Sequence, residues 1–174
     1  MQGCSLLKSG KTTILLADNH AIVRRGIKAL LEYEPDFLVV AEASDGAAAL
    51  GLIESHQPHI LVTDLCMPNM SGIELLKIIK EKKLSIRSVV LSMCGDAPYV
   101  TGALDAGAYG FVLKEAGVEH LVTAIREAYA GQQGPLVEDF CLNNDHGEAI
   151  LSVGDLYLSA DLPRQSALWL YRTV

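Results

Sequence analysis

The fold is decided by a short apolar run that ends in an acid, Ile60-Leu61-Val62-Thr63-Asp64, and by the loop that follows it, Leu65-Cys66-Met67-Pro68-Asn69-Met70-Ser71-Gly72. Apolar runs of this length indicate buried strands. Three further runs also end in polar groups: residues 13–17 at Asp18 and Asn19, residues 89–91 at Ser92, and residues 109–113 at Lys114. Because the carboxyl ends of parallel strands share one edge of a sheet, these runs predict a site at that edge.

Apolar runs alternate along the chain with segments of helical spacing, which is typical of strand–helix units and a parallel sheet. The predicted strands are residues 13–18, 37–42, 60–64, 88–92 and 109–113. Four helices are expected to turn these side chains inward: Val23, Ile27, Leu30 and Leu31; Ala49, Leu50 and Ile53; Leu75, Leu76 and Ile79; Leu121, Ile125 and Ala128. Pro35 should stop the first helix, Asp96 should cap the fourth, and the last should end near Gly131. The sequence predicts an α/β fold.

Composition narrows the class of protein. The 174 residues are half hydrophobic and carry a net charge of −7, which fits one globular domain and argues against a surface for nucleic acid or anionic lipid. No apolar run approaches a membrane span, and no secretory signal is recognised. Four scattered cysteines without a CxxC pair indicate neither a zinc site nor a disulfide scaffold. A cytoplasmic location with reduced thiols is therefore expected.

The polar groups at the predicted sheet edge have complementary chemistry. They comprise an acid and an amide, a second acid, a hydroxyl and an amine. Carboxylate and amide oxygens suit a hard cation, while the hydroxyl and the amine suit the oxygens of a phosphoryl group. Each residue alone has an ordinary reading as a turn, a cap or a solvated charge. Their joint placement on four strand ends favours the functional reading.

Two stretches carry a family resemblance: Ile14-Leu15-Leu16-Ala17-Asp18-Asn19-His20-Ala21-Ile22-Val23-Arg24 and Ala106-Gly107-Ala108-Tyr109-Gly110-Phe111-Val112-Leu113-Lys114. With the strand ends above, they resemble the receiver domain of two-component response regulators, in the NarL/FixJ branch. The resemblance implies a doubly wound, flavodoxin-like sheet of five parallel strands in the order 2-1-3-4-5, flanked by five helices. It divides the chain into an extension (1–11), a receiver (12–131) and an acidic tail (132–174) with a net charge of −4.

The resemblance also assigns roles in phosphoryl transfer. Asp64 falls on the phosphoacceptor, Ser92 on the hydroxyl that binds the phosphoryl group and moves on activation, and Lys114 on the family's amine. Phe111 falls on the aromatic switch, which is expected to turn inward as Ser92 moves. The chain is expected to phosphorylate itself from a phosphodonor and to lose the phosphoryl group slowly, without being an enzyme otherwise.

One cofactor is implied, Mg²⁺. Asp18, Asn19 and Asp64 fall on its side-chain ligands, and Cys66 is expected to offer its backbone carbonyl. Asn19 departs from the family pattern, which has a second acid there, so Mg²⁺ affinity is expected to be about tenfold weaker. Glu115 stands where many receivers have proline, which argues against a cis peptide after Lys114.

Other functions fit less well. A carboxylate-nucleophile phosphohydrolase would need an acid at Cys66, and a flavodoxin would need a phosphate cradle where Asp18 and Asn19 stand. The Gly10-Lys11-Thr12 triplet lacks the P-loop's preceding glycine and comes before a strand instead of after one. The alternative left open is a degenerate receiver that binds a partner without being phosphorylated, which Asn19 alone supports.

The expected partners are a sensor histidine kinase or a phosphotransfer protein, together with a homodimer. NarL-type regulators usually control transcription through a LuxR-type helix-turn-helix, and residues 154–165 resemble its lead-in. No recognition helix or basic surface follows in the remaining nine residues. Direct DNA binding by this chain and membrane association are not expected. The apolar residues of the tail are predicted to pack against a receiver.

Overall fold

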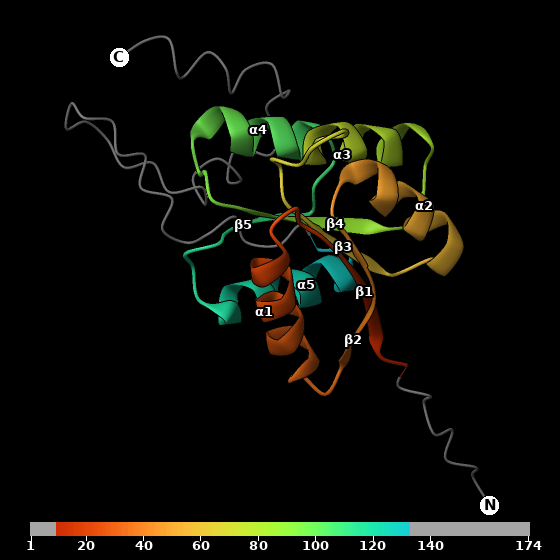
Figure 1. Ribbon diagram of the computed structural model, residues 1–174, viewed down its shortest axis with the longest axis vertical. Coiled ribbons are helices and arrows are strands. Elements are labelled where there is room, and N and C mark those ends of the chain that lie inside the picture. Colours follow the sequence, from red (N-terminus) through yellow and green to blue (C-terminus); the bar gives the residue numbers. More distant parts are fainter. Residues whose placement is uncertain (1–9, 133–174) are drawn as a thin grey trace, which may run out of the picture.

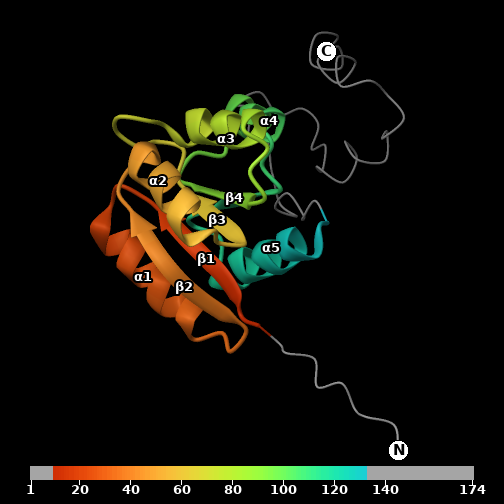
Figure 2. The same ribbon diagram turned by 90° about the vertical axis from the view of Figure 1, so that its right-hand side faces the viewer.

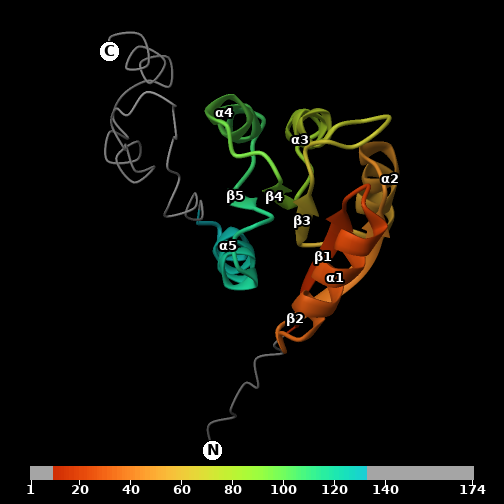
Figure 3. The same cartoon turned by 60° about the vertical axis from the view of Figure 1, so that its left-hand side comes forward.

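The computed structural model describes residues 10–132, which form one parallel sheet between two layers of helices (Figure 1). The strands are β1 (Thr12–Ala17), β2 (Phe37–Ala43), β3 (Ile60–Thr63), β4 (Arg87–Ser92) and β5 (Gly110–Leu113). Their order is β2-β1-β3-β4-β5, and every pairing is parallel; the order can be followed in Figure 3. The predicted fold and strand order are confirmed, with strand bounds within one residue of those predicted.

Five helices alternate with the strands: α1 (Ala21–Glu32), α2 (Gly46–His56), α3 (Gly72–Glu81), α4 (Ala97–Asp105) and α5 (Val118–Ala130). Helices α1 and α5 cover one face of the sheet, and α2, α3 and α4 cover the other (Figures 1 and 2). No helix within residues 10–132 is long and apolar enough to cross a membrane.

The core explains why the strands read as continuous apolar runs. Ile14 and Leu16 of β1 pack in the cluster beneath α1 and α5, whereas Leu15 and Ala17 pack in the cluster beneath α2 and α3. All four are at most 2% exposed. Alternate side chains of a strand point to opposite faces, so a strand covered on both faces is apolar at every position.

The predicted inward faces hold for α3 and α5, and for α2 with Leu50 only partly buried. They are wrong for part of α1, in which Val23 is 36% and Leu30 is 51% exposed. Leu31 is buried and Ile27 packs against the core. Helix α1 lies over β1 and β2, at one end of the sheet, so only a narrow stripe of its surface meets other apolar groups.

Local signals set the helix ends. Ser71 and Glu74 form a reciprocal capping box at the start of α3, and Gly131 ends α5 in a left-handed conformation with φ of 81°. Asp96 occupies the position before α4, but its side chain makes no capping hydrogen bond, contrary to the prediction. Its carboxylate instead accepts from the Cys94 thiol at 3.1 Å. Every peptide bond described is trans, including the one after Lys114.

Candidate phosphoacceptor site

The sheet itself fixes three of the predicted site residues. The backbone N–H of Asp18 donates to the Ala43 carbonyl at 3.1 Å, and that of Asp64 donates to the Ala17 carbonyl at 2.8 Å. The N–H of Lys114 donates to the Ser92 carbonyl at 2.8 Å. Each residue thus continues the ladder one step beyond its strand. The backbone positions of the three residues are therefore set by the sheet itself.

The side chains of Asp18, Asp64 and Lys114 meet at this edge. The Lys114 Nζ lies 2.7 Å from Oδ2 of Asp18 and 2.7 Å from Oδ2 of Asp64. All three side chains are at most 6% exposed. Burial acts to lower the pKa of the Lys114 ammonium, but hydrogen bonds to both carboxylates outweigh it, so the pKa is raised. The ammonium therefore stays charged between two acids.

The second oxygen of Asp64 is oriented by its own loop. Oδ1 accepts from the backbone N–H of Leu65 at 2.7 Å and, at 3.4 Å, from that of Cys66. Gly72 holds the far end of the loop, because its N–H donates to the Leu65 carbonyl at 3.0 Å. A Cβ at Gly72 would lie 2.1 Å from the Asp64 carbonyl oxygen. The loop and α3 can approach this closely only with glycine there.

Ser92 and Phe111 are both buried, at 2% and 1% exposed. The Ser92 Oγ accepts from the backbone N–H of Cys94 at 3.2 Å. Phe111 packs with Val90 and Ala103 between the sheet and α4. The ring of Phe111 lies inward in this structure, and its expected movement with Ser92 on phosphorylation stays a prediction.

Asn19 and Cys66 lie at the solvent-facing side of the site, and both are exposed. Within residues 10–132 the Asn19 side chain makes no hydrogen bond. The Cys66 backbone faces the site through its N–H contact with Asp64. Their predicted roles as metal ligands remain predictions.

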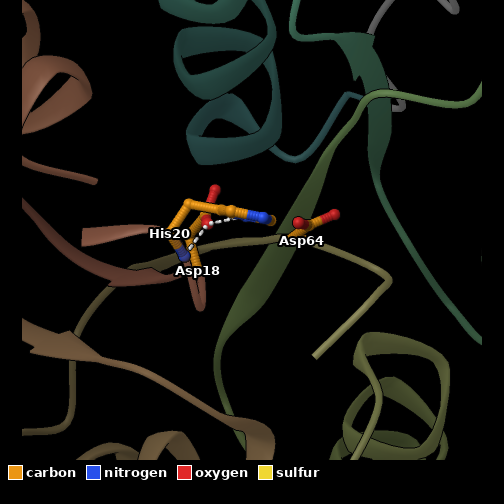
Figure 4. A group of neighbouring side chains, drawn as sticks. All are labelled: Asp18, His20 and Asp64. Atoms are coloured by element: carbon orange, nitrogen blue, oxygen red, sulfur yellow. Dashed lines mark hydrogen bonds and ion pairs between the residues drawn. The ribbon is translucent and has the colours of Figure 1, made fainter. Parts of the chain in front are cut away.

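His20 is a site residue that the sequence interpretation missed. Its backbone N–H donates to Oδ1 of Asp18 at 2.7 Å, and its Nδ1 lies 3.2 Å from the same oxygen. Ligand atoms of Asp18, His20 and Asp64 all lie within 4.8 Å of one another, and Figure 4 shows the imidazole reaching from Asp18 toward Asp64. The sequence feature that could have indicated His20 is its position directly after the Asp18-Asn19 pair.

The charge balance of the site fits a divalent cation. Two buried carboxylates face one ammonium, which leaves one net negative charge at a place closed to most water. The Asn19 amide is the next residue after Asp18 and carries a neutral oxygen. Carboxylate and amide oxygens with water are the ligands that Mg²⁺ prefers. The residues present therefore fit Mg²⁺.

Comparison with known proteins points to one family. Residues 14–126 match the response regulator receiver domain. The nitrate/nitrite response regulator protein NarL of Escherichia coli strain K12 is 43% identical over 120 residues, which cover 69% of this chain and 56% of that protein. The chain thus spans about half the length of the curated relatives it matches.

Solved structures agree. The receiver domain of the putative response regulator NarL from Mycobacterium tuberculosis has a TM-score of 0.69 at 32% identity, covering 71% of this chain and 99% of that one. The isolated receiver domain of RcsB from Salmonella enterica serovar Typhimurium, solved in the presence of phosphomimetic BeF₃⁻, has a TM-score of 0.66 at 32% identity. It covers 71% of this chain and 91% of that one.

Proposed function

This chain belongs to the response regulator receiver family, and from that premise we propose that residues 12–131 are the phosphoacceptor of a two-component phosphorelay. A sensor histidine kinase or a phosphotransfer protein would phosphorylate Asp64. The observation that carries the proposal is the contact of one buried ammonium, Lys114, with two buried carboxylates, Asp18 and Asp64, at the carboxyl edge of the sheet. One ammonium cannot neutralise two buried carboxylates, and the remaining buried charge is costly, so such a group points to a site built for reaction.

Asp64 is the proposed nucleophile. Its carboxylate oxygen attacks the phosphorus, an O–P bond forms, and the P–N bond of a phosphohistidine, or the P–O bond of acetyl phosphate, breaks with its electron pair leaving on the donor. The backbone N–H of Leu65 and the Lys114 ammonium hold the two carboxylate oxygens, so the attacking group is oriented in advance.

Charge stabilisation is the second part of the mechanism. The transferring phosphoryl group spreads negative charge over its equatorial oxygens. The Lys114 ammonium can shift its hydrogen bond from the Asp64 carboxylate to a phosphoryl oxygen. The Ser92 hydroxyl can donate a hydrogen bond to another phosphoryl oxygen. Asp18, Asn19, Asp64 and the Cys66 carbonyl would hold Mg²⁺. When bound, Mg²⁺ supplies further positive charge to the phosphoryl oxygens.

The wider role is proposed from the relatives. The receiver family is not a family of enzymes, so the activity proposed is self-phosphorylation with slow dephosphorylation. We further propose that this chain is cytoplasmic, forms a homodimer and takes part in the regulation of transcription; its similarity to a nitrate/nitrite response regulator protein supports a role in a regulatory pathway. The RcsB receiver was solved with a phosphomimetic, which supports the proposed phosphorylation here.

Acetyl phosphate with Mg²⁺ tests the proposal. Intact-mass spectrometry should show one added phosphoryl group on the whole chain, none on Asp64→Asn, and one on the control Asp105→Asn, whose side chain is exposed at the end of α4. Labelling that persists in Asp64→Asn would overturn the assignment.

The second candidate is a degenerate receiver, favoured by the neutral, exposed Asn19. Asn19→Asp separates the two, because an added ligand charge should tighten Mg²⁺ binding about tenfold. A native chain that stays unlabelled while Asn19→Asp becomes labelled would favour the degenerate receiver. Labelling of both, with tighter Mg²⁺ binding in the variant, would support the phosphoacceptor.

A further inference from the structure

We infer that His20 supplies a ring nitrogen to the cation held by Asp18 and Asp64, so that the site favours a first-row transition-metal dication over Mg²⁺. The inference rests on the proposed function, in which the same two acids hold a divalent cation. It goes beyond that function by naming the ligand set and the class of ion.

The geometry fits a single coordination sphere. The His20 Nδ1 lies 3.2 Å from Oδ1 of Asp18, and ligand atoms of the two acids and the imidazole all lie within 4.8 Å of one another. With metal–ligand bonds of about 2.1 Å, neighbouring ligands of an octahedral ion lie roughly 3.0 Å apart and opposite ligands roughly 4.2 Å apart. Small side-chain movements would therefore bring all three groups onto one ion.

The imidazole is held near the site by its backbone. His20 is the residue before α1, its N–H donates to Oδ1 of Asp18, and its carbonyl accepts from the N–H of Arg24 at 2.9 Å. The Arg24 guanidinium in turn donates to the Asp18 carbonyl. The ring itself is 59% exposed, and among residues 10–132 its one hydrogen bond is to Asp18. It can therefore turn its lone pair toward an ion that enters from solvent (Figure 4).

The chemistry of the ligand atoms decides which ion gains most in affinity from the imidazole. Mg²⁺ prefers oxygen ligands, whereas imidazole suits iron, nickel, copper and zinc. The site also has the neutral Asn19 in place of a second acid, which lowers the charge available to a hard ion. A nitrogen ligand restores binding affinity for a transition-metal ion, whereas it adds little affinity for Mg²⁺. The alternative is that His20 only hydrogen-bonds Asp18 to start α1.

The test uses the whole, untagged chain and two readouts. Electron spin echo envelope modulation of bound Mn²⁺ detects a directly coordinated nitrogen, and titration gives the ratio of Ni²⁺ to Mg²⁺ affinity. Nitrogen coupling should be present in the native chain and lost in His20→Ala, and the affinity ratio should fall about tenfold in that variant. The control is His56→Ala, because His56 is an exposed histidine at the last residue of α2 and is not part of the site. This variant should keep the nitrogen coupling and the native affinity ratio.

Two results would overturn the inference: a native spectrum without nitrogen coupling, or coupling and an affinity ratio that survive in His20→Ala. Labelling of Asp64 by acetyl phosphate with Mg²⁺, measured on the native chain, distinguishes a failure of this inference from a failure of the proposed function. A chain that is labelled but shows no coupling contradicts the role of His20 alone. A chain that shows coupling but is never labelled contradicts the phosphoacceptor assignment and leaves the role of His20 supported.

Discussion

At the scale of single residues, Lys114 decides the charge state of the site. Its ammonium contacts both Asp18 and Asp64, and each of these side chains is nearly closed to solvent. Two carboxylates this close repel each other strongly unless a cation stands between them. Lys114 thus stabilises the fold and also orients Asp64, the proposed nucleophile.

Lys114→Met should lower the free energy of unfolding by about 3 kcal/mol, because it leaves two buried acids without their partner. Urea denaturation measures this, and saturating Mg²⁺ should restore part of the loss. Lys77→Met, on the exposed side of α3, should change stability by less than about 0.5 kcal/mol. Equal stability of native and Lys114→Met chains would contradict the charge balance described here.

The sequence predicted residues of this site unevenly. Asp18, Asp64, Ser92 and Lys114 were predictable because strand ends determine where their backbones lie. His20 was not, since the direction of its side chain depends on a loop held by several hydrogen bonds. The inward ring of Phe111 was not predictable either, because a rotamer depends on the packing around it.

At the scale of elements, the loop after β3 depends on close contact between its ends. Gly72 begins α3 against the backbone of Asp64, and Gly46 begins α2 where a Cβ would lie 2.6 Å from the Met70 carbonyl oxygen. Neither contact can be relieved by rotating a side chain, because the nearest atoms belong to the backbone. These two contacts tie α2 and α3 to the loop between β3 and α3, which follows the proposed phosphoacceptor Asp64.

Gly72→Ala should therefore destabilise the protein by at least about 2 kcal/mol and slow labelling of Asp64, because the loop must move to admit the Cβ. Gly51→Ala is the matched control, since no atom lies within 4 Å of a Cβ there and the residue lies inside α2. It should raise stability by about 0.5–1 kcal/mol. A fully labelled, equally stable Gly72→Ala chain would show that the loop tolerates the shift.

Arg126 joins α5 to the turn before β2. Its guanidinium contacts Asp36 at 2.8 and 3.0 Å and Glu34 at 2.7 Å. The hydrogen bonds from Arg126 lower the pKa of Asp36 from its ordinary 3.8. A carboxyl whose pKa is lowered on folding contributes stability above its ordinary pKa and loses it as the pH falls through the folded value.

Arg126→Met should consequently cost up to about 1 kcal/mol at pH 7, a small effect because both partners are nearly half exposed. The difference from the native chain should shrink as the pH falls below 3.8. Urea denaturation at pH 7 and at a pH below 3.8 measures this difference in the free energy of unfolding. The Arg126 guanidinium also lies 5.2 Å from the centre of the Phe37 ring. A difference that stays constant or grows in acid would mean that Arg126 acts through this contact and not through Asp36.

At the scale of the whole molecule, the described residues 10–132 form one sheet of five strands, five helices and the core between them. This arrangement was predictable almost completely, because strands buried on both faces are apolar throughout and the helices between them have their own period. The helix surfaces were less predictable: Val23 and Leu30 match the helical period of α1, but the sheet ends before it can cover them. The predictions for residues 133–174 lie outside the described residues.

Deletion of residues 132–174 should leave the receiver folded and Asp64 labelled at the native rate, since the strands, the helices and the contacts that hold Asp18, Asp64 and Lys114 are all made by residues before 132. It should change the oligomeric state or the solubility, because the tail carries Leu156, Leu158, Leu168, Trp169 and Tyr171, which would be costly to expose together. Light scattering and labelling kinetics test both parts. Loss of labelling on deletion would show that the tail belongs to the site.

The central claim is that Asp64 receives a phosphoryl group, and locating that group tests it most directly. Borohydride reduces an aspartyl phosphate to homoserine, which peptide mass spectrometry assigns to one position. After treatment with acetyl phosphate and Mg²⁺, the account predicts homoserine at position 64 and at no other aspartate. Homoserine at Asp18 or at any other position, or its absence from a chain whose intact mass shows phosphorylation, would contradict it.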